Sequence, residues 1–305
     1  MLFERIALKV VALCVLCCTI AEQVETSPSS GHPAPPPHSE SLRRKQRTVD
    51  ATLPRLGDLQ SGAAGVLNQH FVPLVDCAAI YKSGLNISGL YYINPDGNGD
   101  FLVYCDMSRL DGVYNGWTVI QRRVSDSVDF NKYWNDYTFG FGDLDANFWL
   151  GLNKIKRITD SATYKLYIAV QFQDADVVSY ESVRFAEYDS FSLGTSANNY
   201  QLSVSSYNST ISTAGDSLIS RHNGKYFSTR DRDNDNSPPD CAGQYQSGWW
   251  FNGCLDSNLN GVWESTGYLD TIVLPVYFGV SWKTAEQYQS TYSFKTAVMA
   301  VRTNR

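Results

Sequence analysis

Short apolar runs separated by turn-forming residues dominate the chain from Phe71 onward, and this pattern predicts a β-rich domain. Residues 101–107 and 116–123 have the length and the β-branched or aromatic content of strands. Apolar residues alternate with other residues through 164–172, which predicts one of the clearest strands. Residues 292–302 predict another strand near the end of the chain.

Two segments follow helical spacing instead. Asp129 is the N-cap that we expect for a helix running to about Tyr137. A second helix is expected over residues 146–158, where Phe148, Leu152 and Ile155 recur at helical intervals. Residues 205–290 show little periodicity and many turn formers. An irregular region of this length is usually functional or held by a ligand.

The first 70 residues have a different character. Arg5 and Lys9 precede a short apolar stretch that ends at Ala21, which is typical of a secretory signal peptide over residues 1–21. It is too short to span a bilayer, and we expect no membrane span elsewhere. Residues 22–70 are rich in Pro, Ser and charge, which predicts a disordered linker. The basic run 43–47 is either a solvated part of this linker or a protease cleavage site.

Cysteine and sequon content agrees with export. Once the signal peptide leaves, Cys77, Cys105, Cys241 and Cys254 remain, and four cysteines allow three disulfide connectivities. Nearest-neighbour pairing is the simplest of the three, and these four cysteines have no CxxC spacing that would favour zinc. Asn86-Ile87-Ser88 and Asn208-Ser209-Thr210 are glycosylation sequons and predict surface positions for Asn86 and Asn208.

Amino-acid composition excludes some classes of function. The 305 residues carry 31 acidic against 25 basic side chains, a net charge of −6, which argues against a nucleic-acid partner. Aromatic residues make up 13% of the chain, a content that requires an ordered core. We therefore expect one acidic globular domain over residues 71–305, and an acidic body suits cations better than phosphates.

A cluster of acidic residues suggests a metal loop. Asp231, Asp233 and Asp235 alternate with other residues before Pro238, Pro239 and Cys241. Carboxylates are hard oxygen ligands, which suit Ca²⁺ rather than zinc or copper. The EF-hand pattern fails, because its Gly and Glu positions hold Asn and Ala here. A solvated acidic turn is the alternative reading.

Two further motifs are candidates for a catalytic or ligand-binding site. Residues 215–218 spell GDSL, a string found in serine esterases, and His222 lies five residues from Ser217. That class places its base far downstream and no His follows His222, so we expect no enzyme activity. Tyr245, Trp249, Trp250 and Phe251 lie between Cys241 and Cys254. Such a cluster forms either core or one wall of a ligand pocket.

Many of these motifs together resemble a fibrinogen-related domain, the family of ficolins, tachylectins, angiopoietin-like proteins and fibrinogen chains. The resemblance runs from about residue 74 to 305. It is carried by residues 76–77 (DC), 88–95 (SGLYYINP), 116–123 (GWTVIQRR), 140–152 (GFGDLDANFWLGL), 214–218 (AGDSL), 222–235 (HNGKYFSTRDRDND) and 241–254 (CAGQYQSGWWFNGC). It implies an α+β fold with a central twisted antiparallel sheet, a few short helices and a loop-rich C-terminal lobe. It also implies the disulfides Cys77–Cys105 and Cys241–Cys254.

The resemblance also implies a calcium site and a ligand pocket. The Asp233 and Asp235 side chains and the backbone carbonyls of Ser237 and Pro239 match the family's Ca²⁺ ligands, with Asp231 in a supporting role. The pocket of lectin-like members lies beside this loop. There Gly253 and Cys254 share a peptide bond that is often cis, and Tyr245 and Tyr292 match aromatic walls. Leu255 departs from the pattern, because many members have His at this position.

The sequence therefore predicts a secreted, calcium-stabilised fibrinogen-related lectin without a collagen stalk. It would bind acetylated or other glycans, as a pattern-recognition protein of innate immunity. The alternative is a secreted protein ligand of a cell-surface receptor or the extracellular matrix, as angiopoietin-like members are, and Leu255 favours this alternative somewhat. Weak single sites would need multivalency, so a homo-oligomer built from the globular body or the tail is a further hypothesis.

Overall fold

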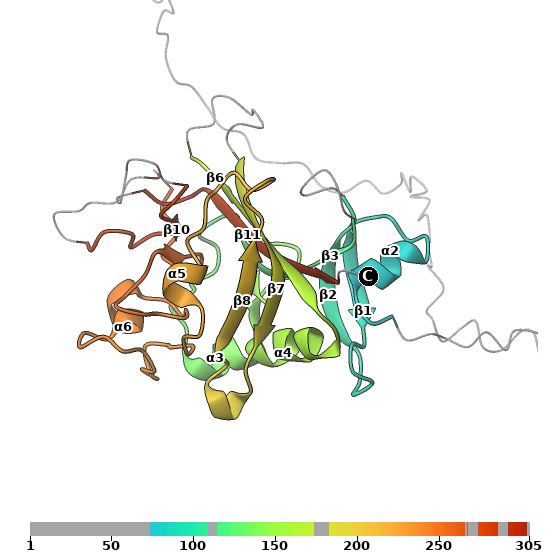
Figure 1. Ribbon diagram of the computed structural model, residues 1–305, viewed down its shortest axis with the longest axis horizontal. Helices are drawn as coiled ribbons and strands as arrows, with labels where there is room; N and C mark the ends of the chain where they lie inside the picture. The colour runs from blue at the N-terminus through green and yellow to red at the C-terminus, as the bar shows by residue number, and fades with distance from the viewer. Residues whose placement is uncertain are drawn as a thin grey trace, which may run out of the picture. The chain divides into compact units, whose positions relative to one another are not determined.

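The computed structural model describes residues 74–108, 115–173, 183–265, 267, 274–285 and 292–303. The expected signal peptide, the linker and the basic run 43–47 lie outside the described residues. The remaining chain forms one unit (Figure 1). Its helices are α2 (Cys77–Lys82), α3 (Trp134–Phe139), α4 (Leu152–Ser161), the 3₁₀ turn η3 (Ser196–Asn198), α5 (Ile219–His222) and α6 (Cys241–Tyr245).

One antiparallel sheet forms the centre of the unit, in the order β1-β2-β3-β11-β6-β7-β8. The short strands β4 and β5 extend it from β3. The strands are β1 (Gly89–Ile93), β2 (Phe101–Asp106), β3 (Trp117–Arg123), β4 (Phe141–Gly142), β5 (Phe148–Trp149), β6 (Tyr164–Gln171), β7 (Val183–Leu193), β8 (Leu202–Tyr207) and β11 (Thr296–Thr303). The C-terminal strand β11 thus lies in the middle, between β3 and β6.

Three of the expected strands agree with β2, β3 and β6 within a residue or two. Burial alternates along β2 and along much of β6, whereas β3 is buried on both faces. The fourth begins later than expected. Residues 292–295 precede β11, which runs from Thr296 to Thr303. Helix α4 packs against the sheet near β7, and Figure 1 shows it crossing below the central strands.

Both expected helices are present, but each begins later in the chain than we predicted. Asp129 is not an N-cap: its carboxylate accepts from the Asn131 N–H at 2.8 Å, and α3 starts at Trp134. Phe148 and Trp149 form strand β5 instead of the first helical turn. Gly151 separates the two elements with φ 107°, and a Cβ there would lie 2.6 Å from the Phe139 carbonyl carbon. This turn delays α4 to Leu152.

The aromatic residues fill the core. Trp117, Trp149, Trp249, Trp250 and Trp282 are all buried in the sheet, its covering helices and the C-terminal lobe. Strands β9 (Ser257–Asn258) and β10 (Ser281–Trp282) make the only second sheet in the described residues, and it lies within that lobe. No described helix has both the length and the apolar character needed to cross a membrane.

Candidate functional site

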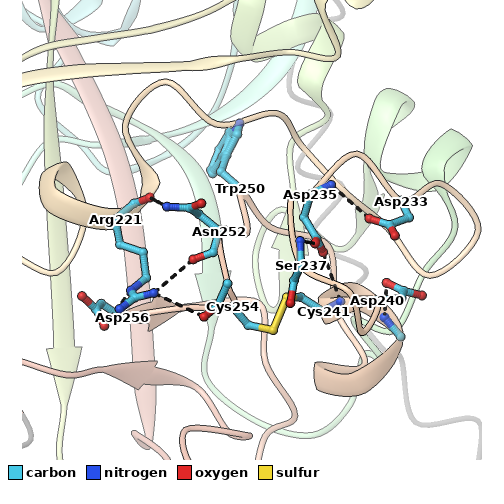
Figure 2. The surroundings of a disulfide bond; sticks show 12 residues. Arg221, Asp233, Asp235, Ser237, Asp240, Cys241, Trp250, Asn252, Cys254 and Asp256 are labelled. Atoms are coloured by element: carbon cyan, nitrogen blue, oxygen red, sulfur yellow. Dashed lines mark hydrogen bonds and ion pairs between the residues drawn. A yellow bond between two sulfur atoms is a disulfide. The ribbon is translucent and has the colours of Figure 1, made fainter.

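The irregular C-terminal lobe carries the expected metal loop, and a disulfide ties it to a second loop (Figure 2). Cys241, the first residue of α6, is bonded to Cys254 across 13 residues. The other disulfide joins Cys77 of α2 to Cys105 of β2. Both bonds are therefore those that the resemblance implies. The metal loop itself runs from Ser228 to Asp240 and enters α6.

Asp235 organises the metal loop from within. One carboxylate oxygen accepts from the Ser237 N–H at 2.7 Å, and the other accepts from the Cys241 N–H at 3.1 Å. The Asp233 carboxylate in turn accepts from the Asp235 N–H at 3.0 Å. These bonds curl the loop around the carboxylates, as Figure 2 shows. Each oxygen keeps a further lone pair for a cation.

Three carboxylates meet at this loop. Asp233, Asp235 and Asp240 each offer an oxygen, and the three oxygens lie within 4.8 Å of one another. The sequence pattern did not predict Asp240 as a candidate metal ligand. Asp240 is also the N-cap of α6, where its carboxylate accepts from the Gly243 N–H at 2.9 Å. Its position directly before Cys241 was the available signal, since carboxylates favour helix N-termini.

The donor set fits Ca²⁺. Besides the three carboxylates, the loop offers the backbone carbonyls of Ser237 and Pro239, which no hydrogen-bond donor reaches within the described residues. Carboxylate and carbonyl oxygens together are what this hard cation takes. Burial, reinforced by the charges of Asp233 and Asp240, raises the pKa of Asp235. A divalent cation would offset this mutual repulsion.

Asp231 supports the loop from outside the cluster. Its carboxylate accepts from the Trp134 N–H at 2.9 Å and from the Thr229 hydroxyl at 2.7 Å. The first bond reaches the start of α3, where a free N–H would otherwise need a partner. Asp231 therefore fixes the beginning of the metal loop against α3, in the supporting position that the resemblance implies.

The second loop, which carries Cys254, is held from the opposite side. Arg221 of α5 donates to the carbonyls of Asn252 and Gly253 at 3.1 and 3.3 Å, and pairs with Asp256 at 3.0 Å (Figure 2). Lys283 also pairs with Asp256, at 3.1 Å. Burial alone would raise the pKa of Asp256, but the two cations outweigh it and lower this pKa.

The residues expected to line the ligand pocket offer little exposed surface. The Gly253–Cys254 peptide bond is cis, and Gly253 is exposed. Tyr245 and Leu255 are each only 7% exposed, and Tyr292 is 4% exposed. Tyr245 stacks on Phe251, so the aromatic cluster between the cysteines forms mainly core. Leu255 therefore adds little to an apolar surface.

Tyr292 belongs to a different aromatic group from Tyr245. Its ring lies 5.6 Å from that of Phe172 and 5.7 Å from that of Phe294. Its hydroxyl accepts from the Gln173 N–H, beside the end of β6. An acetyl-binding wall built from Tyr292 stays a prediction.

The GDSL string is structural. Asp216 accepts from the N–H groups of Leu218 and Ile219, and from the Tyr188 hydroxyl at 2.8 Å. Ser217 is buried and bonds to the Thr284 hydroxyl at 2.8 Å. These contacts start α5 and attach it to the loop after β10.

His222 also has a structural role, because both of its ring nitrogens form hydrogen bonds to the backbone. One imidazole nitrogen bonds to the Trp250 carbonyl at 2.7 Å, and the other accepts from the N–H groups of Asp256 and Ser257, both at 3.1 Å. Burial lowers the pKa of His222 to about 4, so the ring is neutral at physiological pH. It bridges two stretches of the lobe.

At the start of α3, the exposed Tyr133 and the half-buried Trp134 meet two exposed arginines of the metal loop. We call Tyr133, Trp134, Arg230 and Arg232 the aromatic–arginine surface. The Arg230 guanidinium lies 4.6 Å from the Tyr133 ring centre, and that of Arg232 lies 4.1 Å from the Trp134 ring centre. Tyr133 is 51% exposed, and both arginines are exposed. Sequence periodicity could not predict these arginine–aromatic contacts, because the residues come from two distant segments.

Fold and disulfides together define the class of protein. The chain belongs to the family described as the C-terminal globular domain of fibrinogen beta and gamma chains, whose model matches residues 74–304. The family assignment and the α+β fold expected from sequence are therefore confirmed.

Particular relatives are known from sequence. Fibrinogen-like protein 1 of Rattus norvegicus is 41% identical over 242 residues, which cover 74% of this chain and 71% of the relative. Angiopoietin-related protein 7 of Homo sapiens is 34% identical over 278 residues, which cover 87% of this chain and 74% of the relative.

Solved structures agree. The fibrinogen-like globe domain of human ANGPTL2 has a TM-score of 0.68 and 37% identity, covering 76% of this chain and all of that chain. Lamprey fibrin D-dimer, complexed with the peptide ligand Gly-His-Arg-Pro-amide, has a TM-score of 0.66 and 32% identity, covering 82% of each chain.

Proposed function

We propose that the protein is a secreted, non-enzymatic ligand that binds a protein partner on a cell surface or in the extracellular matrix. Similarity to angiopoietin-related protein 7 and to fibrinogen-like protein 1 favours this function over the glycan-binding lectin that the sequence placed first. The lamprey fibrin structure is complexed with a short peptide ligand, which supports a peptide-binding role for a domain of this fold. The structural roles of Ser217 and His222 support a function without catalysis.

The aromatic–arginine surface is the observation that carries the proposal. Trp, Tyr and Arg are the residues that most often dominate binding energy at protein interfaces. Aromatic rings hold the guanidinium groups of Arg230 and Arg232 in place, and the N–H groups that these arginines do not use within the protein can donate to carboxylates. Asp231, between them, uses its carboxylate on Trp134 and Thr229. The surface therefore suits a partner that presents acidic side chains.

A charge reversal tests the proposal. We expect Arg230→Glu to weaken binding of the full-length protein to responsive cells at least tenfold, measured by flow cytometry. Lys295→Glu, a matched reversal at an exposed residue near β11, should bind like the unmodified protein. Trypsin treatment of the cells should abolish binding, whereas glycosidase treatment should not. Glycosidase-sensitive binding, with retention on an N-acetylglucosamine resin that free acetate reverses, would instead establish the lectin.

We also propose that Ca²⁺ stabilises the metal loop. Asp233, Asp235 and Asp240 would bind it with carboxylate oxygens, and Ser237 and Pro239 with carbonyl oxygens. A bound cation would cancel the repulsion among the carboxylates and fix the chain that leads from Arg230 into α6. Its role is therefore structural support for the neighbouring surface.

Calcium binding is tested by thermal unfolding with Ca²⁺ and with a chelator. At a Ca²⁺ concentration of about 100 times Kd, we expect about 2.7 kcal/mol of stabilisation. Asp235→Asn should remove this response, because it deletes a charged ligand and weakens the loop. Asp126→Asn, an equivalent change at an exposed carboxylate outside the loop, should keep it. Equal melting with Ca²⁺ and chelator in the unmodified protein would refute the site.

A further inference from the structure

The two edges of the central sheet differ in chemistry. At one edge, β8 turns Ser203 and Ser205 toward solvent. At the other edge, β1 exposes Leu90 and Tyr92, which are 40% and 65% exposed. Figure 1 shows β1 at the end of the unit opposite to α6 and the metal loop. An exposed apolar edge strand is a template for pairing with another chain, and proteins normally block it.

The apolar character extends over both outermost strands. Leu90 pairs with Tyr104 of β2, and Tyr92 pairs with Leu102. Directly paired residues project from the same side of a sheet, so these four side chains share one face. Leu102 and Tyr104 are half-buried, and the opposite face of β2 packs in the core. We call these four residues the outer β1–β2 face.

The loop before β1 adds to the exposed apolar surface. Ile87 is 75% exposed and Leu85 is 49% exposed. Between them stands Asn86, the acceptor residue of the first sequon. Asn86 is exposed, and its side chain has no hydrogen bond to any described residue. Leu90 lies four positions further along the chain, so the two residues are at most about 14 Å apart.

The second sequon lies in a different setting. Asn208 is half-buried at the end of β8. Its N–H donates to the Glu187 carbonyl at 2.9 Å, and its carboxamide oxygen accepts from the Thr210 N–H at 3.3 Å. The neighbouring exposed residues of β8 are serines, so this edge needs no cover. The sequence alone ranks the two sequons equally, and the structure separates them.

We propose that Asn86 carries an N-linked glycan that covers the outer β1–β2 face and keeps a second copy of the chain from pairing with β1. An N-glycan is bulky and solubilising, and the loop places it within reach of Leu90 and Tyr92. The glycan thus acts at the edge strand as charged side chains or prolines do in other sheets. This inference rests on the proposed passage of the chain through the secretory pathway.

Glycan occupancy is tested on the full-length protein secreted from mammalian cells. Enzymatic deglycosylation in heavy-oxygen water followed by peptide mass spectrometry should show Asn86 converted to labelled Asp. An unmodified Asn86 in a secreted protein would overturn the inference and leave the proposed function standing. Retention of the protein inside the cell, with neither sequon occupied, would overturn both.

The role of the glycan is tested by sedimentation velocity and by binding of the apolar dye ANS. We expect Asn86→Gln to self-associate with rising concentration and to increase ANS fluorescence severalfold. Asn208→Gln should match the unmodified protein. Adding Leu90→Thr and Tyr92→Thr to Asn86→Gln should restore both readouts, because it removes the apolar face and keeps strand-forming residues.

Two outcomes would contradict this role. Asn86→Gln could sediment and bind ANS like the unmodified protein, which would show that the face needs no glycan. It could also gain binding to cells without self-association, which would make the outer β1–β2 face a partner surface instead. In the first case the triple variant would have nothing to restore, and in the second it would lose the gained binding to cells.

Discussion

At the scale of single residues, the C-terminal lobe depends on a few buried polar side chains. His222 is the clearest example, because one ring serves three backbone groups. An unpaired buried acceptor or donor costs about 1–3 kcal/mol, so each of these bonds matters to the stability of the lobe. The ring does this only while it is neutral.

The neutrality of His222 predicts a pH dependence. Its folded pKa of about 4 is below the unfolded value of 6.5, so the unfolded chain binds a proton more readily between these values. The free energy of unfolding should therefore fall as pH drops from 6.5 to 4, by up to about 3 kcal/mol. Chemical denaturation of the unmodified protein and of His222→Gln at several pH values measures it.

The comparison isolates the imidazole, because the carboxylates titrate in both proteins. We expect His222→Gln to be less stable at pH 7 and to lose less stability on acidification. Parallel pH profiles for the two proteins would show that His222 makes no such contribution.

At the scale of elements, the two disulfides allow a matched comparison. Cys77–Cys105 closes 28 residues and Cys241–Cys254 closes 13, so chain entropy predicts contributions of about 3.6 and about 3 kcal/mol. Removing either pair by double Cys→Ser substitution should lower the free energy of unfolding by a similar amount. Only loss of Cys241–Cys254 should also weaken the calcium response, because Cys241 follows the metal loop.

Urea unfolding with and without Ca²⁺ measures both effects. Equal losses of calcium response in the two double variants would mean that the response reflects global stability. The metal loop would then draw no support from its own disulfide.

The sequence predicts those strands and helices that neighbouring residues determine, and it does not predict those that depend on contacts with distant parts of the chain. Alternation locates β6, whereas the length and the β-branched or aromatic content of the apolar runs locate β2 and β3. The local pattern fails at β5 and at the start of α4, where Gly151 turns the chain against Phe139 and strand pairing overrides helical spacing. The position of β11 between β3 and β6 has no local signal at all.

In the candidate site, too, some residues are predictable from the local sequence and others are brought together only by the fold. The family motifs locate Asp233 and Asp235, because those residues alternate in one loop. Asp240 joins them only through the turn into α6. The contact of Asp231 with Trp134 crosses 97 residues, so neither it nor the aromatic–arginine surface could be predicted from spacing.

At the scale of the whole molecule, removal of the expected signal peptide would set the N-terminus of the mature protein. We expect the secreted protein to begin at Glu22, because Ala21 and Thr19 suit signal peptidase. N-terminal sequencing and intact mass after deglycosylation will show this. Ala21→Arg, which places a large cation at the cleavage position, should slow removal of the segment. A secreted chain that retains residues 1–21 would contradict the expectation.

The bond between Asp231 and the Trp134 N–H has a thermodynamic consequence. It joins the start of the metal loop to the start of α3, where Tyr133 and Trp134 lie, so ordering of the loop favours ordering of this aromatic pair and the reverse. If Ca²⁺ raises affinity for a partner by some factor, the partner must raise affinity for Ca²⁺ by the same factor. A domain that holds calcium weakly in isolation would then retain it once bound. Measured on the free domain alone, its calcium affinity would be underestimated.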